Sequence, residues 1–235
     1  MAIEVFNRYE HKYMLSEEQY AGAVEIIGKH MTADAYCQAG KPYTIANIYY
    51  DTKDDFLIRT SLQSPVYKEK LRLRSYGVPD EESDVFLEIK KKYKGIVNKL
   101  RSAMRLSDAR ALLGNKSTEI TEKMNRQVVR EIEYFLSVHA VAPKVYIAYD
   151  RIAYFEEGNP DLRISFDMNI RSRRFDTALE KGDYGTPLVS GGAYLMEIKT
   201  ALSKPLWLCR MLDELGIKRT SFSKYGTEYK RSLAI

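Results

Sequence analysis

The chain has 235 residues, of which 45% are hydrophobic and 29% charged, and its formal net charge is +5. This predicts a substantial hydrophobic core and suits a polyanionic partner without requiring one. The two widely separated cysteines exclude a disulfide framework and a cysteine zinc site, and no stretch approaches the roughly 20 apolar residues of a membrane span, so we expect a cytoplasmic protein with no transmembrane segment.

The spacing of apolar residues predicts a β-rich chain. In chain order we expect a strand (4–14), a helix (17–30), a strand (44–51), a short helical turn (54–60), three strands (66–76, 85–93, 96–106), two helices (107–114, 121–138), three strands (145–156, 162–171, 193–200), a helix (205–215) and a polar, basic tail. Because most strands neighbour one another in sequence, antiparallel pairing is favoured. No repeat or linker divides the chain, so we expect one domain over residues 1–235.

The strand over 66–76 has the most informative pattern. Every second residue is a cation, and two of the three residues between them are leucines; the four cations are Lys68, Lys70, Arg72 and Arg74. Residues two apart in a strand share a face. One face is therefore cationic, and its opposite is largely apolar.

Other strands repeat this alternation. Cations and a few acids alternate with apolar residues in six further strands; they include Glu10, Lys12, Glu88, Lys90, Lys99, Arg101, Arg151, Arg163, Glu197 and Lys199. For one strand alone, a solvated face would be the simpler interpretation. The excess of cations, and three separate Glu-x-Lys steps, favour a binding surface instead.

These charged faces predict an unusual interior. The apolar faces need cover, which the amphipathic helices could supply from outside, so the charged faces would line a lumen. Such a lumen is costly to fold unless it serves a function. Arginine and lysine suit phosphate oxygens, whereas carboxylates tolerate phosphate when Mg²⁺ or Mn²⁺ lies between them. We therefore expect a metal-bridged di- or triphosphate.

At this point the residues resemble a known family. The matching segments are Arg8-Tyr-Glu-His-Lys-Tyr13, Lys70-Leu-Arg-Leu-Arg74, Leu87-Glu-Ile-Lys90, Asn98-Lys-Leu-Arg101, Tyr149-Asp-Arg-Ile-Ala153, Leu162-Arg-Ile-Ser-Phe-Asp167, Met196-Glu-Ile-Lys199 and Phe222-Ser-Lys-Tyr225. In order and spacing they resemble the triphosphate tunnel metalloenzymes, also called CYTH-like proteins. Within that superfamily, the chain is most similar to the catalytic domain of vacuolar transporter chaperone (VTC) proteins.

The resemblance implies an α+β fold: an eight-stranded antiparallel β tunnel, closed as a barrel, with a charged lumen and helices outside. It also implies a polyphosphate polymerase, in which the γ-phosphate of ATP passes to a growing inorganic polyphosphate chain and ADP is released. Mn²⁺ or Mg²⁺ would be the cofactor. ATP and polyphosphate would be the partners, nucleic acid is not expected, and a membrane partner protein is left open.

The resemblance also implies roles for particular residues. Glu197 would bind the metal, with Glu10 as a second carboxylate. The catalytic set would be Lys90, Arg72, Arg74, Lys199 and Glu197. The phosphate-binding set would be Lys12, Lys70, Lys99, Arg101, Arg151, Arg163, Ser223 and Lys224.

Two alternatives stay open. Many hydrolytic members of the superfamily carry Glu-x-Glu-x-Lys where this chain has Arg8-Tyr-Glu10-His-Lys12, and this replacement of a carboxylate by a cation favours the polymerase. An inorganic triphosphatase or nucleoside triphosphatase on the same tunnel is the first alternative. A non-catalytic module that binds polyphosphate or inositol phosphate is the second.

Overall fold

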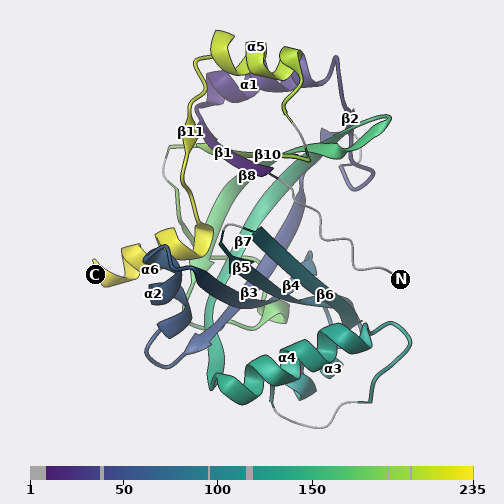
Figure 1. Cartoon of the computed structure of the whole chain (residues 1–235), viewed down its shortest axis with the longest axis vertical. Coiled ribbons are helices and arrows are strands. Elements are labelled where there is room, and N and C mark those ends of the chain that lie inside the picture. The colour runs from purple at the N-terminus through teal and green to yellow at the C-terminus, as the bar shows by residue number, and fades with distance from the viewer. Residues whose placement is uncertain are drawn as a thin grey trace. The chain divides into compact units, whose positions relative to one another are not determined.

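Figure 1 shows the computed structural model of the chain, which describes residues 9–37, 40–94, 96–114, 119–189, 191–201 and 203–234. The chain divides into two compact units: unit 1 comprises residues 1–44, 149–170 and 187–223, and unit 2 comprises residues 45–148, 171–186 and 224–235. Strands β7 (Val141–Glu156) and β8 (Asn159–Arg173) contribute residues to both units. Arg8, residues 4–7 of the first expected strand, and Gly95 lie outside the described residues.

The chain has an α+β fold with a large antiparallel sheet. The hydrogen-bonded order of its main strands is β11-β1-β10-β8-β7-β3-β4-β5-β6. The remaining strands are β1 (Tyr9–Leu15), β2 (Thr32–Ala33), β3 (Tyr43–Thr52), β4 (Tyr67–Tyr76), β5 (Asp84–Tyr93), β6 (Ile96–Arg105), β9 (Thr186–Pro187), β10 (Tyr194–Thr200) and β11 (Arg219–Thr220). Every strand pair whose register is described is antiparallel, as the sequence indicated. Among the described residues, hydrogen bonds do not close this order into a ring, so the closed barrel stays a prediction.

In unit 1, two helices cover the apolar face of the sheet. Helices α1 (Glu17–Ile27) and α5 (Leu206–Glu214) lie side by side (Figure 1). They pack so closely that a Cβ atom on Gly22 would come within 2.9 Å of the side chain of Leu215, just after α5. Their buried residues join one cluster with inward residues of β1, β8 and β10. Helix α1 begins where the sequence predicts it, because the side chains of Ser16 and Gln19 cap each other's backbone N–H groups.

In unit 2, the apolar face is covered in the same way. Helices α3 (Leu106–Leu113) and α4 (Arg126–Val138) bury their apolar stripes against β3 to β7. Asn125 caps α4 by accepting hydrogen bonds from two backbone N–H groups of its first turn. Leu71, Leu73, Leu87 and Ile89, which alternate with the predicted cations, are almost completely buried in this cluster. The charged faces of the same strands therefore point away from α3 and α4.

Two short helices of unit 2 contact the charged side instead. They are α2 (Phe56–Leu62) and α6 (Lys224–Leu233). The ammonium group of Lys68 donates to the carbonyl oxygen of Ser61 in α2, and that of Lys70 lies 5.9 Å from the ring centroid of Tyr225 in α6. These two helices thus cover part of the face that carries the cations.

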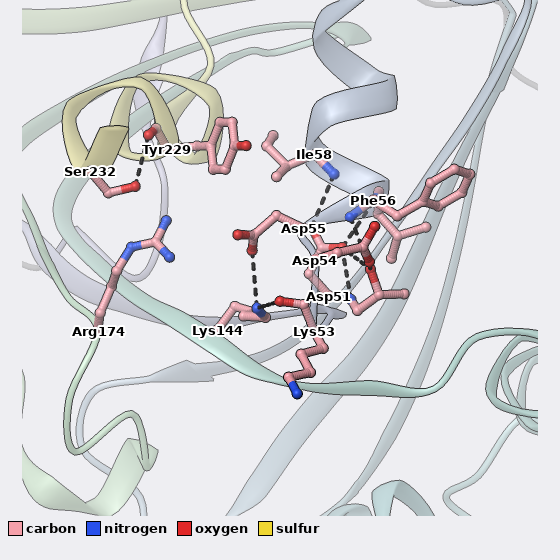
Figure 2. A network of polar contacts seen from close by, with 12 residues as sticks. Asp51, Lys53, Asp54, Asp55, Phe56, Ile58, Lys144, Arg174, Tyr229 and Ser232 are labelled. Atoms are coloured by element: carbon pink, nitrogen blue, oxygen red, sulfur yellow. Dashed lines mark hydrogen bonds and ion pairs between the residues drawn. The ribbon is translucent and has the colours of Figure 1, made fainter. Parts of the chain in front are cut away.

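A buried aspartate joins α2 and α6. The Asp51 carboxylate, at the end of β3, accepts hydrogen bonds from the backbone N–H groups of Leu57 and Ile58 in α2 (Figure 2). It also accepts one from the hydroxyl group of Tyr225 in α6, at 2.8 Å. Next to it, the ammonium group of Lys144 lies between the carbonyl oxygen of Lys53 and the Asp55 carboxylate (Figure 2).

The structure differs from the sequence-based expectation in several places, including three unexpected two-residue strands, β2, β9 and β11. Helix α6 occupies the tail, where only polarity and positive charge were expected. Its buried face includes Glu228, whose charge is balanced by a two-pronged ion pair with Arg174, so an apolar pattern is absent. The connection between the strands expected at 145–156 and 162–171 is shorter than expected: it ends at Gly158, whose φ of +80° suits glycine, and the following residues already belong to β8.

Candidate phosphate-binding site

The cations predicted on β4, β5 and β6 lie on one face of unit 2. The strand register aligns Arg72 with Glu88 and Arg101, and it aligns Lys70 with Lys90 and Lys99. Directly opposed residues on neighbouring strands have side chains on the same side of the sheet. Six residues of the predicted site therefore gather on one surface: Lys70, Arg72, Arg74, Lys90, Lys99 and Arg101.

A single carboxylate, that of Glu88, lies at the centre of this cationic cluster. Its Oε2 atom lies 2.6 Å from Nε of Arg72 and 3.8 Å from Nε of Arg74. Its Oε1 atom lies 2.7 Å from Nζ of Lys99 and 3.8 Å from Nε of Arg101. The Glu88 side chain is 1% exposed, whereas those of Lys99 and Arg101 are 39% and 37% exposed. The acid is therefore buried beneath cations that solvent still reaches.

The charges in this cluster shift one another's protonation. Burial would raise the pKa of Glu88, but Arg72, Arg74 and Lys99 outweigh it and hold the pKa of this carboxyl well below its usual range. Burial lowers the pKa of Lys99 to about 7; the charges of Arg72 and Arg74 act in the same direction, and Glu88 opposes them. Burial is the largest cause of this shift and the neighbouring cations add to it, so a bound anion would favour the protonated form of Lys99.

Neutral side chains hold the two arginines in place. Nε of Arg74 donates to Oδ1 of Asn47 at 2.9 Å, and Asn47 in turn donates to the carbonyl oxygen of Ile147. One terminal nitrogen of Arg72 donates to the hydroxyl group of Tyr49 at 3.3 Å. A guanidinium group presents five N–H donors in one rigid plane, a geometry that suits the recognition of phosphate oxygens.

Unit 1 carries a second cluster, in which acids and cations alternate. The register of β1, β10 and β8 aligns Lys12 with Glu197 and aligns Glu10 with Lys199. Nζ of Lys12 lies 3.5 Å from Oε1 of Glu10 and 3.3 Å from Oε1 of Glu197, and it donates to the carbonyl oxygen of Phe222. The two carboxylates that the sequence nominated for a metal therefore converge on one ammonium group.

Arg151 extends this second cluster. Its guanidinium group binds the Asp167 carboxylate through two hydrogen bonds of 2.6 and 2.8 Å and lies 3.7 Å from Oε2 of Glu197. Burial would lower the pKa of Arg151, but Asp167 and then other anionic neighbours raise it, so the guanidinium stays charged. Nζ of Lys199 lies 4.0 Å from Oε2 of Glu197.

Three predicted residues remain. Arg163 lies opposite Lys199 in the register of β8 and β10, and its half-exposed guanidinium group pairs with Asp34 at 3.0 Å. Ser223 and Lys224 lie at the start of α6, where Lys224 is largely buried. Each of these two makes contacts within the protein. Their assignment to phosphate binding stays a prediction.

The carboxylates fit a divalent cation of the type expected. Among the described residues, no group of three or more histidine, cysteine, aspartate or glutamate side chains could hold a metal by itself. Mg²⁺, however, is usually bound through one or two carboxylates together with substrate phosphates and water. Glu10 and Glu197 supply that smaller donor set, and hard oxygen ligands suit Mg²⁺ and Mn²⁺.

The predicted site includes neither Glu88, which lies at the centre of the first cluster, nor Asp167, which pairs with Arg151 in the second. The sequence pattern marks Glu88 only as part of a Glu-x-Lys step, although its position opposite Arg72 follows once the register of the β4–β5 hairpin is known. Tyr49, which is also absent from the predicted site, stacks on Tyr225 and contacts Arg72. No local signal marks either pairing, since each joins residues far apart in the chain.

Comparisons with known proteins agree with this geometry. The family model described as "VTC domain" matches residues 7–233. An adenylate cyclase-like protein from Bacillus halodurans has the same fold, with a TM-score of 0.54 at 14% identity over 91% of this chain and 92% of that chain. HpAC1 from Hippeastrum, an adenylyl cyclase-like protein described as having a dominant triphosphatase activity, has a TM-score of 0.51 at 18% identity over 92% of both chains.

A search of curated protein sequences gave no match, and no helix among the described residues is long and apolar enough to cross a membrane. The match to the family model spans both units and nearly every segment that carries the predicted cations and carboxylates. The chain therefore belongs to the VTC domain family.

Proposed function

We propose that this protein is a polyphosphate polymerase, which transfers the γ-phosphate of ATP to a growing inorganic polyphosphate chain and releases ADP. The observation that carries the proposal is the cation-rich strand face of unit 2. Within unit 1, two carboxylates suited to a divalent cation converge on Lys12. Membership of the VTC domain family supports it. The single catalytic domain, the eight-stranded closed tunnel and the cytoplasmic location belong to this proposal.

In this proposal, the cations would bind phosphates and the carboxylates would bind the metal. Phosphoryl transfer needs little covalent help from the protein, so positioning and charge neutralisation would provide most of the catalysis. Arg72, Arg74 and Lys90 would bind and polarise the phosphates of ATP, while the remaining cations would bind the polyphosphate chain. Glu197 and Glu10 would hold Mn²⁺ or Mg²⁺, which supplies charge neutralisation between phosphate oxygens.

A triphosphatase is the second candidate. It is favoured by the fold shared with HpAC1, which is described as having a dominant triphosphatase activity. Water would then replace the terminal phosphate of the chain as the acceptor. The replacement of one family carboxylate by Arg8 argues for the polymerase, because a second metal site would lack a ligand.

Incubation with ATP and Mn²⁺ separates the candidates. Long-chain polyphosphate, seen on a gel together with one ADP per phosphate added, supports the polymerase. Orthophosphate without polyphosphate supports the triphosphatase. Tight binding of tripolyphosphate without turnover, measured by calorimetry, would support the non-catalytic module and refute both enzymes.

A further inference from the structure

We propose that Glu88 is a positioning residue of the phosphate site, whose carboxylate fixes Arg72, Arg74 and Lys99 in their binding geometry. The inference deepens the proposed function and rests on it. It assigns a role to a residue that neither binds the expected metal nor belongs to the predicted set of phosphate ligands.

The geometry excludes a direct contact between Glu88 and a phosphate. Its side chain is 1% exposed, and a carboxylate repels phosphate oxygens at short range. Each of its oxygens already faces two cations: Arg72 and Arg74 on one side, Lys99 and Arg101 on the other. Glu88 therefore acts through these cations, from beneath them.

Without Glu88 the cations would separate. Four positive groups lie within 4 Å of one carboxylate, and like charges gathered around one anion repel one another once that anion is removed. The arginines have other partners, Tyr49 and Asn47, whereas Lys99 has Glu88 as its described ion-pair partner. Lys99 is therefore the cation whose position and charge depend most on Glu88.

The charges that face Lys99 set the direction of its response. They come from three strands: Lys70, Arg72 and Arg74 of β4, Glu88 and Lys90 of β5, and Arg101 of β6. Glu88 is the anion among them. Its removal would leave burial and cationic neighbours acting together on the pKa of Lys99, which already lies near 7, so Lys99 would lose its proton at neutral pH.

The test compares Glu88→Gln with a matched control, Glu131→Gln. Glu131 also pairs with a lysine of β5, Lys91, but from α4 on the opposite face. In Glu88→Gln we expect kcat with ATP at pH 6, where Lys99 is mostly protonated in the wild type, to fall about tenfold or more, with KM within about threefold, because loss of the Glu88 charge and of the Lys99 proton cancel in net charge. Lowering the pH further to 5 should recover part of kcat. Glu131→Gln should match the wild type.

A second readout does not depend on turnover. The side-chain ¹³Cε resonance of Lys99, assigned with Lys99→Arg, reports its pKa directly, and we expect that pKa to fall in Glu88→Gln. An unchanged pKa, or a wild-type kcat and pH profile, would overturn the proposal. Should Glu88→Gln fail to fold, Glu88→Asp keeps the charge but is one methylene shorter; a wild-type kcat in that variant would equally overturn it. A wild-type protein that neither turns over ATP nor binds tripolyphosphate refutes the proposed function, and the Lys99 titration then decides the role of Glu88 alone.

Discussion

The buried contact between Asp51 and Tyr225 allows a prediction whose size follows from the structure. Asp51 is completely buried and accepts hydrogen bonds from the N–H groups of Thr52, Leu57 and Ile58 and from the Tyr225 hydroxyl. In Asp51→Asn the amide oxygen can keep the Thr52 and Leu57 bonds, but the amide nitrogen faces the N–H group of Ile58. One orphaned N–H costs about 1–3 kcal/mol, and the remaining bonds lose their charge assistance, so we expect a loss of about 3 kcal/mol.

Tyr225→Phe should cost less, because it removes one hydrogen bond to a charged acceptor, about 2 kcal/mol. The double variant should lose less than the sum, with a coupling energy of about 1 kcal/mol. Urea unfolding followed by circular dichroism measures all four proteins. Ser232→Ala is the control, since Ser232 bonds only to the carbonyl oxygen of Tyr229 in its own helix α6 among the described contacts (Figure 2), and its effect should stay within about 0.5 kcal/mol. A loss below about 1 kcal/mol for Asp51→Asn, or full additivity, would refute the reasoning.

Three further predictions concern the site. Glu197→Ala should abolish metal-dependent turnover while the protein keeps its far-ultraviolet spectrum, and residual turnover at saturating Mn²⁺ near the wild-type rate would contradict this assignment. Arg74→Ala should weaken ATP binding about tenfold or more by calorimetry, whereas equal affinity would remove Arg74 from the site. Tripolyphosphate should bind more weakly as the pH rises through about 7, because the anion binds the protonated form of Lys99, whose pKa is lowered to about 7. Calorimetry in buffers of different ionisation enthalpy should detect proton uptake on binding. Absence of this uptake in the wild type, or its persistence in Lys99→Arg, would show that Lys99 is not the responsible group.

The sequence predicts most of the sheet, because alternation is a local property. The cations from Lys68 to Arg74 share a face whatever the register of the neighbouring strands, and the leucines between them must be buried. The similar Glu-x-Lys steps only suggest that Glu10 and Glu197 lie near each other, because their convergence on Lys12 depends on the pairing of β1 with β10. The cluster around Glu88 depends on a hairpin register in the same way.

The sequence does not predict helix α6, and the reason is different. Its inward face holds Tyr225, Glu228 and Tyr229, and an acid on a buried face breaks the apolar periodicity on which helix prediction rests. Glu228 is tolerated because Arg174, more than fifty residues earlier in the chain, balances it. Such compensation by a distant residue cannot be read from a local window of sequence.

The ammonium group of Lys12, placed between Glu10 and Glu197, has a consequence for how ligands enter. It acts as an internal counter-ion, whose charge offsets the electrostatic repulsion between the two carboxylates. A divalent ion arriving alone must compete with it, whereas a polyphosphate oxygen that draws Lys12 toward itself would leave the acids to the ion. By thermodynamic linkage, polyphosphate and metal would then bind cooperatively, each raising the affinity of the other by the same factor.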